Sequence, residues 1–398
     1  MKINLAVLFG GNSVEHEVSI ISALQAIRSL NKEKYEVIPV YITKESEFFA
    51  GDRLLDIKAY TNIPQLLKES RRVTFLNRSG RTLLIDDETK LFGKRTEIPV
   101  DIAFPIVHGT NVEDGTLAGF LNQLHLPYVG CDIMSSALCM DKYYSKMILK
   151  AAGIPVLDCV QFTAAEQLDT DRLLNETEAH FPYPVIVKPV NLGSSVGITK
   201  ADDREALAEA IRTAFTYADR LIIEPAVQHL KEINCSVLGD RDEAEASECE
   251  SPVNSDKILS YEDKYMSGGK SGKTGGGSKG MADLQREIPA KISDELRTAI
   301  RETSVRAFKV LGCGGVVRID YLTDTETGKF WLNEVNTIPG SLSFYLWKPV
   351  GTDYPELLDK MIALALKRKR RSDETVFSFD TNLLATFAEG NGAKGAKR

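Results

Sequence analysis

The chain has 398 residues, of which 43% are hydrophobic and 26% are charged, so it can bury sizeable cores and is long enough for two or three domains. Its net charge of −7 disfavours a general binder of nucleic acids or anionic membranes, because such proteins usually present a basic surface. A basic run at 367–371 closes an apolar-periodic stretch, and we interpret it as the solvated end of a helix.

Cysteine usage and the first residues both indicate a cytoplasmic protein. Six cysteines occur without a CxxC spacing, which favours reduced thiols over a disulfide framework or a zinc site. The opening MKINLAVLFGG has a short apolar run broken by Asn4, so we expect a first strand rather than a signal peptide. No stretch reaches the roughly 18 apolar residues that a membrane span needs.

The first part of the chain is predicted to form an open α/β sheet. Residues 2–9 are a mainly apolar run typical of a buried strand, and the following GGNS turns the chain into a helix. Residues 35–42 supply a second strand, which completes the order of an open α/β sheet. After a polar region, residues 100–130 return to strand, loop and helix, and we expect a boundary near Gly130. The first helix is predicted to carry four apolar residues on one face: Val14, Val18, Ile21 and Leu24.

The second segment is predicted to hold a helix, a hairpin and a buried strand. Residues 139–156 should form a helix that ends at Gly153 and Pro155. Residues 183–200 contain two strand-like runs around a glycine-serine loop, which is typical of a hairpin with a movable tip. A buried strand then ends at Glu224, where we place the next boundary.

The third segment is predicted to contain a helix at 292–312, a hairpin at 316–336 and a closing helix near 355–368. The final residues, AEGNGAKGAKR, have almost nothing to bury and are expected to be disordered.

The glycine-rich stretch at 267–280, SGGKSGKTGGGSKG, superficially resembles a Walker phosphate-binding loop. The Walker pattern needs a glycine five residues before Gly272, but that position is Ser267, and the flanks lack the required strand and helix. We therefore interpret the stretch as a flexible lid.

A candidate metal site lies on the predicted hairpin. Side chains alternate in direction along each strand. Arg318 and Asp320 therefore share a face of the first strand, and Glu334 and Asn336 share a face of the second. If the hairpin pairs in simple register, these groups converge, and oxygen ligands of this kind suit Mg²⁺ bound to phosphates. The alternative interpretation is an exposed polar face, which is common on hairpins.

Two lysines are candidates for binding phosphate. Lys188 ends a buried strand and is followed by NLGSSVG, whose small residues let backbone N–H groups approach anionic oxygens. Lys142 in MDKYYSK is the second candidate. Either lysine could instead be an ordinary surface residue at the end of an element.

Seven motifs give the chain a family resemblance. From residue 1 to about 370 it resembles the ATP-grasp ligases, and within them the D-alanine–D-alanine ligase family. The motifs occur in the family's order: GGNSVEHEVS, HGTNVEDGTLAG, SALCMDKYYSK, VIVKPVNLGSSVG, YEDKY, VVRIDY and NEVNTIPGS.

The resemblance implies an α/β fold, in part α+β, that is a three-domain ATP-grasp fold. Residues 1–130 would form the N-terminal open parallel α/β domain. Residues 131–224 would form the central subdomain with a phosphate flap, and 225–372 the C-terminal subdomain with the lid and the metal hairpin. Residues 373–398 would be a partly disordered tail.

The resemblance also implies how ATP and metal are bound. Lys142 and Lys188 would contact phosphates, Glu224 would mark the adenine hinge, and Glu232 would meet the ribose. Asp320, Glu334 and Asn336 would hold two Mg²⁺ ions, for which Mn²⁺ can substitute. The flap and the lid would contribute four further residues: Ser194, Ser195, Lys264 and Tyr265.

For catalysis, the resemblance implies that Arg318 and the backbone at Gly340 stabilise the oxyanion of a tetrahedral intermediate. Glu15 would orient the ammonium group of the first D-alanine and be linked through Ser194 to Tyr265. Glu15 could alternatively be only a helix-capping residue. His108 would lie beside the same substrate, the alternative being a loop histidine without a ligand.

The implied reaction is the ATP-dependent joining of two D-alanine molecules through an acyl phosphate, for peptidoglycan precursor synthesis. The expected partners are D-alanine and ATP, with no nucleic acid and no membrane, and the expected assembly is a cytoplasmic homodimer.

The acceptor region departs from the family pattern. After NTIPG the chain has SLSFYLW, so Tyr345 stands where a serine is common, beside the expected substrate contacts Gly340 and Ser341. Val112 also replaces a glycine in HGTNVEDG. D-Alanine is favoured as the acceptor and D-serine is the next choice. D-Lactate is less favoured because the lid retains DKY.

Two other functional classes stay open at this point. One is an ATP-grasp ligase for other substrates, which would not need Glu15, His108 and Tyr265 together. The other is a noncatalytic nucleotide or NAD-linked module suggested by FGGNS, although that stretch lacks the GxGxxG spacing.

Overall fold

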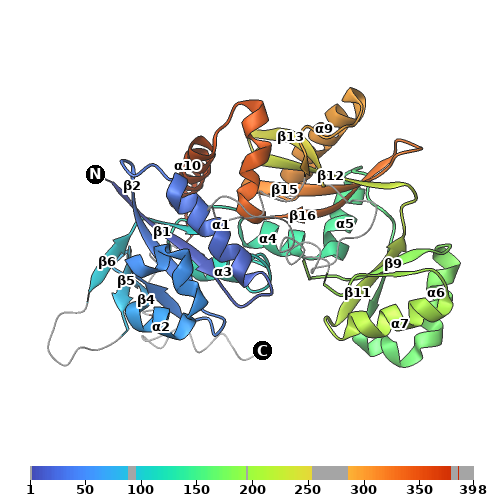
Figure 1. Cartoon of the computed structure of the whole chain (residues 1–398), viewed down its shortest axis with the longest axis horizontal. Coiled ribbons are helices and arrows are strands. Elements are labelled where there is room, and N and C mark those ends of the chain that lie inside the picture. Colours follow the sequence, from blue (N-terminus) through green and yellow to red (C-terminus); the bar gives the residue numbers. More distant parts are fainter. Residues whose placement is uncertain (1, 88–95, 194–195, 253–285, 378–383, 385–398) are drawn as a thin grey trace, which may run out of the picture.

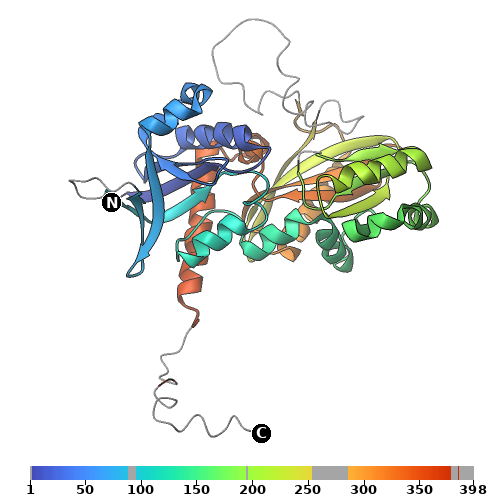
Figure 2. The same ribbon diagram turned by 90° about the horizontal axis from the view of Figure 1, so that it is seen from below.

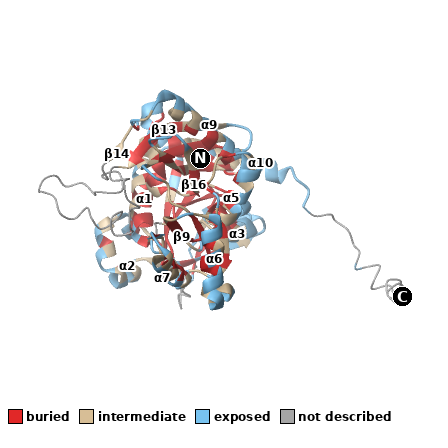
Figure 3. Ribbon diagram, turned by 90° about the vertical axis from the view of Figure 1, so that its right-hand side faces the viewer, coloured by how far each residue is buried: buried red, intermediate tan, exposed pale blue. Residues whose placement is uncertain are grey.

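The computed structural model describes residues 2–87, 96–193, 196–252, 286–377 and 384. Its strands form three sheets of seven, four and five strands, with helices packed on them, which confirms the predicted α/β class (Figure 1). Figure 3 shows buried residues concentrated on the strands and exposed residues on the outer faces of the helices. Among the described helices, none combines the length and apolar character needed to cross a membrane.

The first sheet is part parallel and part antiparallel. Its order is β6-β5-β4-β3-β2-β1-β7, with β1 parallel to both β2 and β7. The strands predicted at 2–9 and 35–42 are confirmed as β1 and β2. The antiparallel extension β3 to β6 was not predicted, because it lies in the polar region where strands are short or half exposed. The bounds are β1 (Ile3–Gly10), β2 (Tyr35–Ile42), β3 (Phe48–Ala50), β4 (Arg71–Arg78), β5 (Arg81–Asp86), β6 (Glu97–Val100) and β7 (Ile102–Pro105).

Helix α1 (His16–Ser29) starts later than its apolar pattern suggested. Val14 precedes the helix and is 57% exposed, so the prediction that it joins the apolar face is wrong. Val18 and Leu24 are buried as expected. The other helical elements of this part are η1 (Asp52–Leu55), η2 (Ile57–Thr61), α2 (Ile63–Glu69) and α3 (Thr116–Gln123).

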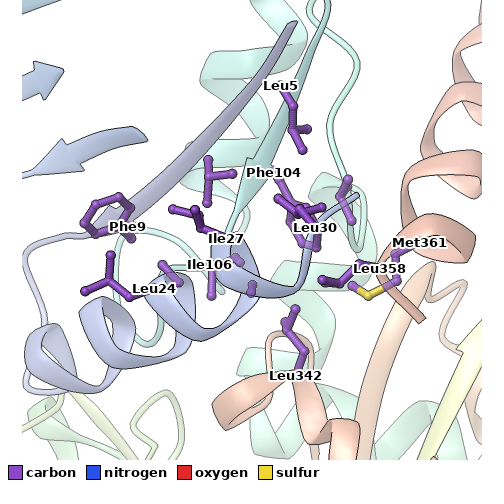
Figure 4. Packing of buried hydrophobic residues seen from close by; sticks show 14 of the residues in the cluster. Leu5, Phe9, Leu24, Ile27, Leu30, Phe104, Ile106, Leu342, Leu358 and Met361 are labelled. Carbon is purple, nitrogen blue, oxygen red and sulfur yellow. The ribbon is translucent and has the colours of Figure 1, made fainter. Parts of the chain in front are cut away.

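The largest core joins the two ends of the sequence. Leu24 and Ile27 of α1 pack between Phe9 of β1 and residues from the last part of the chain (Figure 4). Those late residues include Leu342 and Met361, which belong to η6 (Gly340–Leu346) and α10 (Tyr354–Asp373). Figures 1 and 2 both show α10 alongside the first sheet. The predicted closing helix is thus confirmed, and it fixes the C-terminal part against the N-terminal part.

The second sheet is antiparallel, in the order β10-β9-β11-β8. Helices α6 and α7 pack on the face that carries Val187 and Ile223. Because side chains alternate, Lys188 and Glu224 project from the opposite face. The predicted hairpin (β9 and β10) and buried strand (β11) are confirmed. The bounds are β8 (Val160–Thr163), η3 (Ala164–Asp169), α6 (Thr170–His180), β9 (Val185–Pro189), β10 (Thr199–Ala201), α7 (Arg204–Phe215) and β11 (Arg220–Pro225).

The helix predicted from residue 139 is instead two helices, α4 (Ile133–Met140) and α5 (Lys142–Ala151). The break lies at Asp141, whose Oδ1 accepts hydrogen bonds from the N–H groups of Tyr143 and Tyr144, each 3.0 Å long. This N-cap stabilises the start of α5 and makes Lys142 its first residue.

The third sheet has the order β14-β13-β12-β15-β16. Helix α9 packs on the face that carries Val317 and Ile319, so the opposite face carries Arg318 and Asp320. The predicted hairpin (β15 and β16) and helix (α9) are confirmed. The bounds are β12 (Leu230–Gly239), β13 (Ala244–Pro252), β14 (Arg286–Glu287), α9 (Asp294–Val310), β15 (Gly315–Asp324), β16 (Phe330–Asn336) and η7 (Lys348–Val350).

The boundaries near Gly130 and Glu224 stay predictions. Except for Pro225, which ends β11, each sheet takes its strands from one predicted segment. The face of the second sheet that carries Lys188 and Glu224 approaches the third sheet where Lys188 contacts Asn333, and this is where the candidate site lies.

Candidate active site

Strand pairing brings the four residues of the predicted metal hairpin together. Arg318 pairs with Asn336 and Asp320 pairs with Glu334. The next residue of β15, Tyr321, pairs with Leu332, so the register shifts at Asn333. A bulge of this kind re-aims side chains and is frequent beside active sites.

Hydrogen bonds tie these side chains to one another. Arg318 donates from Nε and Nη2 to the two carboxylate oxygens of Asp320, each over 2.7 Å. Asn336 Nδ2 donates to Asp320 Oδ2 over 3.0 Å. The side chains of Arg318 and Asp320 are only 16% and 15% exposed, so the alternative of a solvated hairpin face is wrong.

Both candidate lysines reach this hairpin from the central part of the chain. Lys188 Nζ donates to Asn333 Oδ1 over 2.9 Å. Lys142 Nζ donates to the carbonyl oxygen of Leu192 over 2.5 Å and lies 3.7 Å from Glu334 Oε2. Both lysines are buried, so they are not the surface residues that the sequence alone allowed. Burial lowers the pKa of Lys142, while the carboxylate of Glu334 opposes that shift.

Glu224 is fully buried between two lysines. It forms ion pairs with Lys188 and, over 2.9 Å, with Lys146. Burial alone would raise the pKa of Glu224, but the two ammonium groups outweigh burial and lower the pKa to about 2. The carboxylate side chain is therefore engaged by the protein, and any contact of this position with a nucleotide base would use the backbone.

The donor set of the hairpin fits Mg²⁺. Two carboxylates and one amide oxygen are hard ligands, and Mg²⁺ usually takes one or two carboxylates and completes its shell with water and phosphate. Among the described residues, no group of three or more His, Cys, Asp and Glu side chains forms a metal-binding cluster. This chemistry favours Mg²⁺ shared with a phosphate ligand over a metal enclosed by protein.

Glu15 lies close to the loop that carries His108, since a Cβ placed on Gly109 would lie 3.4 Å from Glu15 Oε2. Glu15 is the N-cap residue of α1 but makes no side-chain capping hydrogen bond, so the capping alternative gains no support. A Cβ placed on Gly193 would lie 3.6 Å from Glu15 Oε2, which shows that the chain just before the flap tip approaches this carboxylate.

His108 is buried and held through both ring nitrogens. Its Nδ1 lies 2.6 Å from the carbonyl oxygen of Ile338, which can only accept, so Nδ1 carries a proton. Its Nε2 lies 3.2 Å from Ser22 Oγ. Burial lowers the pKa of His108, despite the opposing charge of Glu15, so the ring is neutral at pH 7. The ring is thus fixed by the protein, and its place beside a substrate stays a prediction.

The segment after the hairpin has an unusual backbone. Ser341, Leu342 and Ser343 have φ values of 51°, 52° and 50°, a left-handed run that is costly for residues with side chains. It is held to α1, since the Ser341 N–H donates to Ser22 Oγ over 3.0 Å and the Ser341 hydroxyl donates to Gln25 Oε1 over 2.7 Å. Gly340 directly precedes this run.

Tyr345 lies beside a buried ion pair. The guanidinium carbon of Arg286 is 4.0 Å from the centre of the Tyr345 ring. Arg286 Nη1 donates to both carboxylate oxygens of Glu250, over 3.0 and 3.3 Å, and the Tyr345 hydroxyl lies 3.4 Å from Glu250 Oε1. Tyr345 thus places an aromatic ring against Arg286, and not a small hydroxyl side chain, at the position where the acceptor is expected.

Of the remaining predicted site residues, one is on the third sheet and four lie outside the described residues. Glu232 is on β12, opposite Leu322 of β15. The four flap and lid residues fall outside the described residues; they are Ser194, Ser195, Lys264 and Tyr265. The glycine-rich stretch at 267–280 also falls outside them.

Several residues of the site were missed by sequence reasoning. Lys146 had a detectable signal, since it stands four residues after Lys142 and so on the same face of one helix. Asn333 had none, because only the bulge turns it toward Lys188. Glu113 also had no sequence signal. Its two carboxyl oxygens accept hydrogen bonds from the N–H groups of Gly109 and Ile338. Burial, reinforced by the charge of Glu15, raises the pKa of Glu113 to about 8.

Comparisons with known proteins converge on one family. Residues 4–131 match the family described as D-ala D-ala ligase N-terminus, and residues 148–363 match D-ala D-ala ligase C-terminus. The D-alanine–D-alanine ligase of Thermosipho melanesiensis is 36% identical over 382 residues, covering 96% of this chain and 98% of the relative. The D-alanine–D-alanine ligase of a Thermoanaerobacter species is 40% identical, and the match covers 92% of this chain and 97% of the relative.

Solved structures are similar over nearly the same span. A D-alanine-D-alanine ligase from Coxiella burnetii has a TM-score of 0.76 and 28% identity, covering 98% of this chain and 99% of that chain. The VanG D-Ala:D-Ser ligase of Enterococcus faecalis has a TM-score of 0.76 and 32% identity, and the match covers 92% of this chain and 100% of that chain. The two neighbours have the same fold but names that differ in the second substrate.

Proposed function

The chain belongs to the D-alanine–D-alanine ligase family, and from this premise we propose that it joins two D-alanine molecules at the expense of ATP. It is an ATP-dependent carboxylate–amine ligase of cell-wall precursor synthesis. One observation carries the assignment of the site. Lys188 Nζ from the second sheet donates to Asn333 Oδ1 from the third over 2.9 Å, which supports the proposal by putting a candidate phosphate-binding cation next to the oxygen-rich hairpin.

Lys142 and Lys188 bind the phosphates of ATP in this proposal. Both ammonium groups are held by fixed partners at buried positions, so they need little reorganisation when phosphate charge develops. Glu224 balances the charge of Lys188 and keeps that ammonium group in place. Glu232 contacts the ribose, and the chain around Glu224 contacts the adenine.

Asp320, Glu334 and Asn336 would hold Mg²⁺, and the bound ion would neutralise charge on the transferring phosphoryl group. Arg318 fixes the carboxylate of Asp320 with two parallel hydrogen bonds. With Gly340, Arg318 also stabilises the oxyanion that forms when the amine attacks.

The first D-alanine is oriented by Glu15 and lies near His108. Its carboxylate takes the γ-phosphoryl group of ATP, and the resulting acyl phosphate is attacked by the amine of the second D-alanine, which releases phosphate. Water would hydrolyse the acyl phosphate, so closure of the flap with Ser194 and Ser195 and of the lid with Lys264 and Tyr265 protects it.

The acceptor lies near Gly340, Ser341 and Tyr345 in this proposal. D-Alanine is the favoured acceptor, and D-serine is the alternative, because Tyr345 replaces the small hydroxyl residue common in the family and a D-Ala:D-Ser ligase is among the similar structures. The family resemblance also supports a cytoplasmic homodimer, with domains at 1–130, 131–224 and 225–372.

An assay of the purified protein with MgATP and single or paired amino acids tests the function. D-Alanine alone should give one phosphate per D-alanyl-D-alanine, and L-alanine should give none. Mixed D-alanine and D-serine would reveal the alternative by the ratio of the two dipeptides. Phosphate release that does not depend on any amino acid would contradict the ligase assignment.

A further inference from the structure

Both backbone polar groups of Ile338 are held by the loop that follows β7. Its N–H donates to Glu113 Oε1 over 3.1 Å, and its carbonyl oxygen accepts from His108 Nδ1 over 2.6 Å. The partners come from residues more than 220 positions earlier in the chain. Ile338 is therefore anchored across the junction between the first and the third sheets.

Glu113 is suited to this task by its two oxygens. Oε2 accepts the N–H of Gly109 over 2.7 Å, while Oε1 accepts the N–H of Ile338 and lies 3.4 Å from Thr337 Oγ1. One carboxyl group thus fixes its own loop and the chain that leaves β16. Both oxygens of a carboxyl group keep acceptor lone pairs even when the group is protonated, whereas an amide would turn its NH₂ group toward one of these N–H donors and leave it unsatisfied.

The anchored residue lies between two functional positions. Asn336, the last residue of β16, precedes Ile338 by two residues, and Gly340 follows it by two. Beyond Gly340 the chain enters the left-handed run that begins at Ser341. Because that run is strained, its place depends on anchors, which are Ile338 before the run and the Ser22 hydroxyl at its first residue, Ser341.

We propose that Glu113 is a positioning residue: by holding Ile338 together with His108, it sets the place of the Gly340 N–H that meets the oxyanion. This inference rests on the proposed function. Glu113 itself touches no reacting atom. Its loss displaces an oxyanion donor, and a displacement of about 1 Å can cost on the order of 100-fold in rate.

Displacement of this donor has a specific consequence for the reaction. The oxyanion forms when the second amine attacks the acyl phosphate, so a misplaced Gly340 slows that step. The acyl phosphate then persists and loses part of its population to water. More phosphate is released for each dipeptide formed, which a smaller folded fraction alone cannot cause.

The test compares Glu113→Gln with Asp114→Asn in the full-length enzyme. Asp114 is the matched control, because within the described part of the chain its carboxylate accepts hydrogen bonds from the N–H groups of Asn111 and Thr116, which belong to the same loop. For each protein, phosphate and dipeptide are measured together with kcat, the KM for ATP and the thermal midpoint of unfolding.

We expect Glu113→Gln to lower kcat by about 10- to 100-fold, to leave the KM for ATP within about 2-fold, and to release more than one phosphate per dipeptide. Asp114→Asn should release one phosphate per dipeptide, as the wild type does. One phosphate per dipeptide in Glu113→Gln overturns the inference, whatever happens to kcat. If that variant does not fold, Glu113→Asp, too short to reach both N–H groups, is judged by the same ratio. Absence of dipeptide with the wild type would contradict the proposed function instead.

Discussion

Arg318 donates two parallel hydrogen bonds, each 2.7 Å long, to the two carboxylate oxygens of Asp320, its neighbour two positions along β15. The planar guanidinium fork matches the carboxylate plane, so it fixes both the position and the rotation of the Asp320 side chain. A lysine at this position would keep the charge but not the fork.

Arg318→Lys is therefore expected to lower kcat on the order of 100-fold and to raise the Mg²⁺ concentration for half-maximal rate several-fold. Initial rates at saturating ATP and D-alanine, titrated with Mg²⁺, measure both effects. The control is Arg204→Lys, at an exposed arginine paired with Glu178 on the second sheet's helices. Wild-type Mg²⁺ dependence in Arg318→Lys would contradict the positioning role.

Asp320→Asn and Glu334→Gln are expected to weaken the metal site itself. Each change removes one negative ligand from a set that contains only two carboxylates, so the Mg²⁺ requirement should rise by about 10-fold or more. Glu334→Gln should also leave Lys142 without its carboxylate neighbour at 3.7 Å and raise the KM for ATP. Rates at increasing Mg²⁺ check both variants, and unchanged Mg²⁺ dependence in either one would remove that residue from the metal site.

The hairpin was the part of the site that could be predicted from the sequence, and the reason is periodicity. Alternation predicts that Arg318 and Asp320 share a face of one strand and that Glu334 and Asn336 share a face of the other. The two pairs meet on one side because the bulge at Asn333 shifts the register by one residue. Continuous apolar runs likewise predicted the buried strands β1, β9 and β11. Each of these inferences used only residues close in sequence.

Contacts between distant segments could not be predicted in this way. Whether Lys142 is buried depends on Leu192 and Glu334, and neither is close to it in sequence. The bulge at Asn333 has no local signature. Glu113 looked like one acid in a polar loop, and only the fold brings Ile338 to it. The prediction for Val14 was wrong for a different reason, because the apolar spacing extends to residues that precede the start of the helix at His16.

Glu224→Gln is expected to destabilise the central part of the protein. Removing one charge from a buried ion pair leaves Lys146 and Lys188 uncompensated, which costs about 3–5 kcal/mol of unfolding free energy. Thermal and urea unfolding at pH 7 measure the loss. Glu209→Gln is the matched control, because that glutamate and its partner Arg212 are 67% and 57% exposed, and its effect should stay below about 1 kcal/mol.

The same glutamate predicts a pH dependence. The pKa of Glu224 is lowered from 4.5 to about 2 in the folded protein, so the wild type gains stability from this group above about pH 4.5 and loses it as the pH falls toward 2. The difference in stability between wild type and Glu224→Gln should thus be constant near neutral pH and shrink below about pH 4.5. A difference that grows on acidification would contradict the assigned pKa direction.

Tyr345 allows the acceptor side to be tested by separating its ring from its hydroxyl. The ring stacks on Arg286 at 4.0 Å, whereas the hydroxyl contact with Glu250 is long, at 3.4 Å. Tyr345→Phe keeps the stacking and should leave the KM for the acceptor within about 2-fold of wild type. Tyr345→Ala releases the guanidinium, and a lost cation–π contact of about 1–2 kcal/mol corresponds to a rise in that KM of about 5- to 30-fold. Saturation with D-alanine at fixed MgATP, and competition between D-alanine and D-serine, measure the acceptor site. Equal effects of Phe and Ala would mean that the hydroxyl, and not the ring, organises the acceptor, because only the hydroxyl is missing from both.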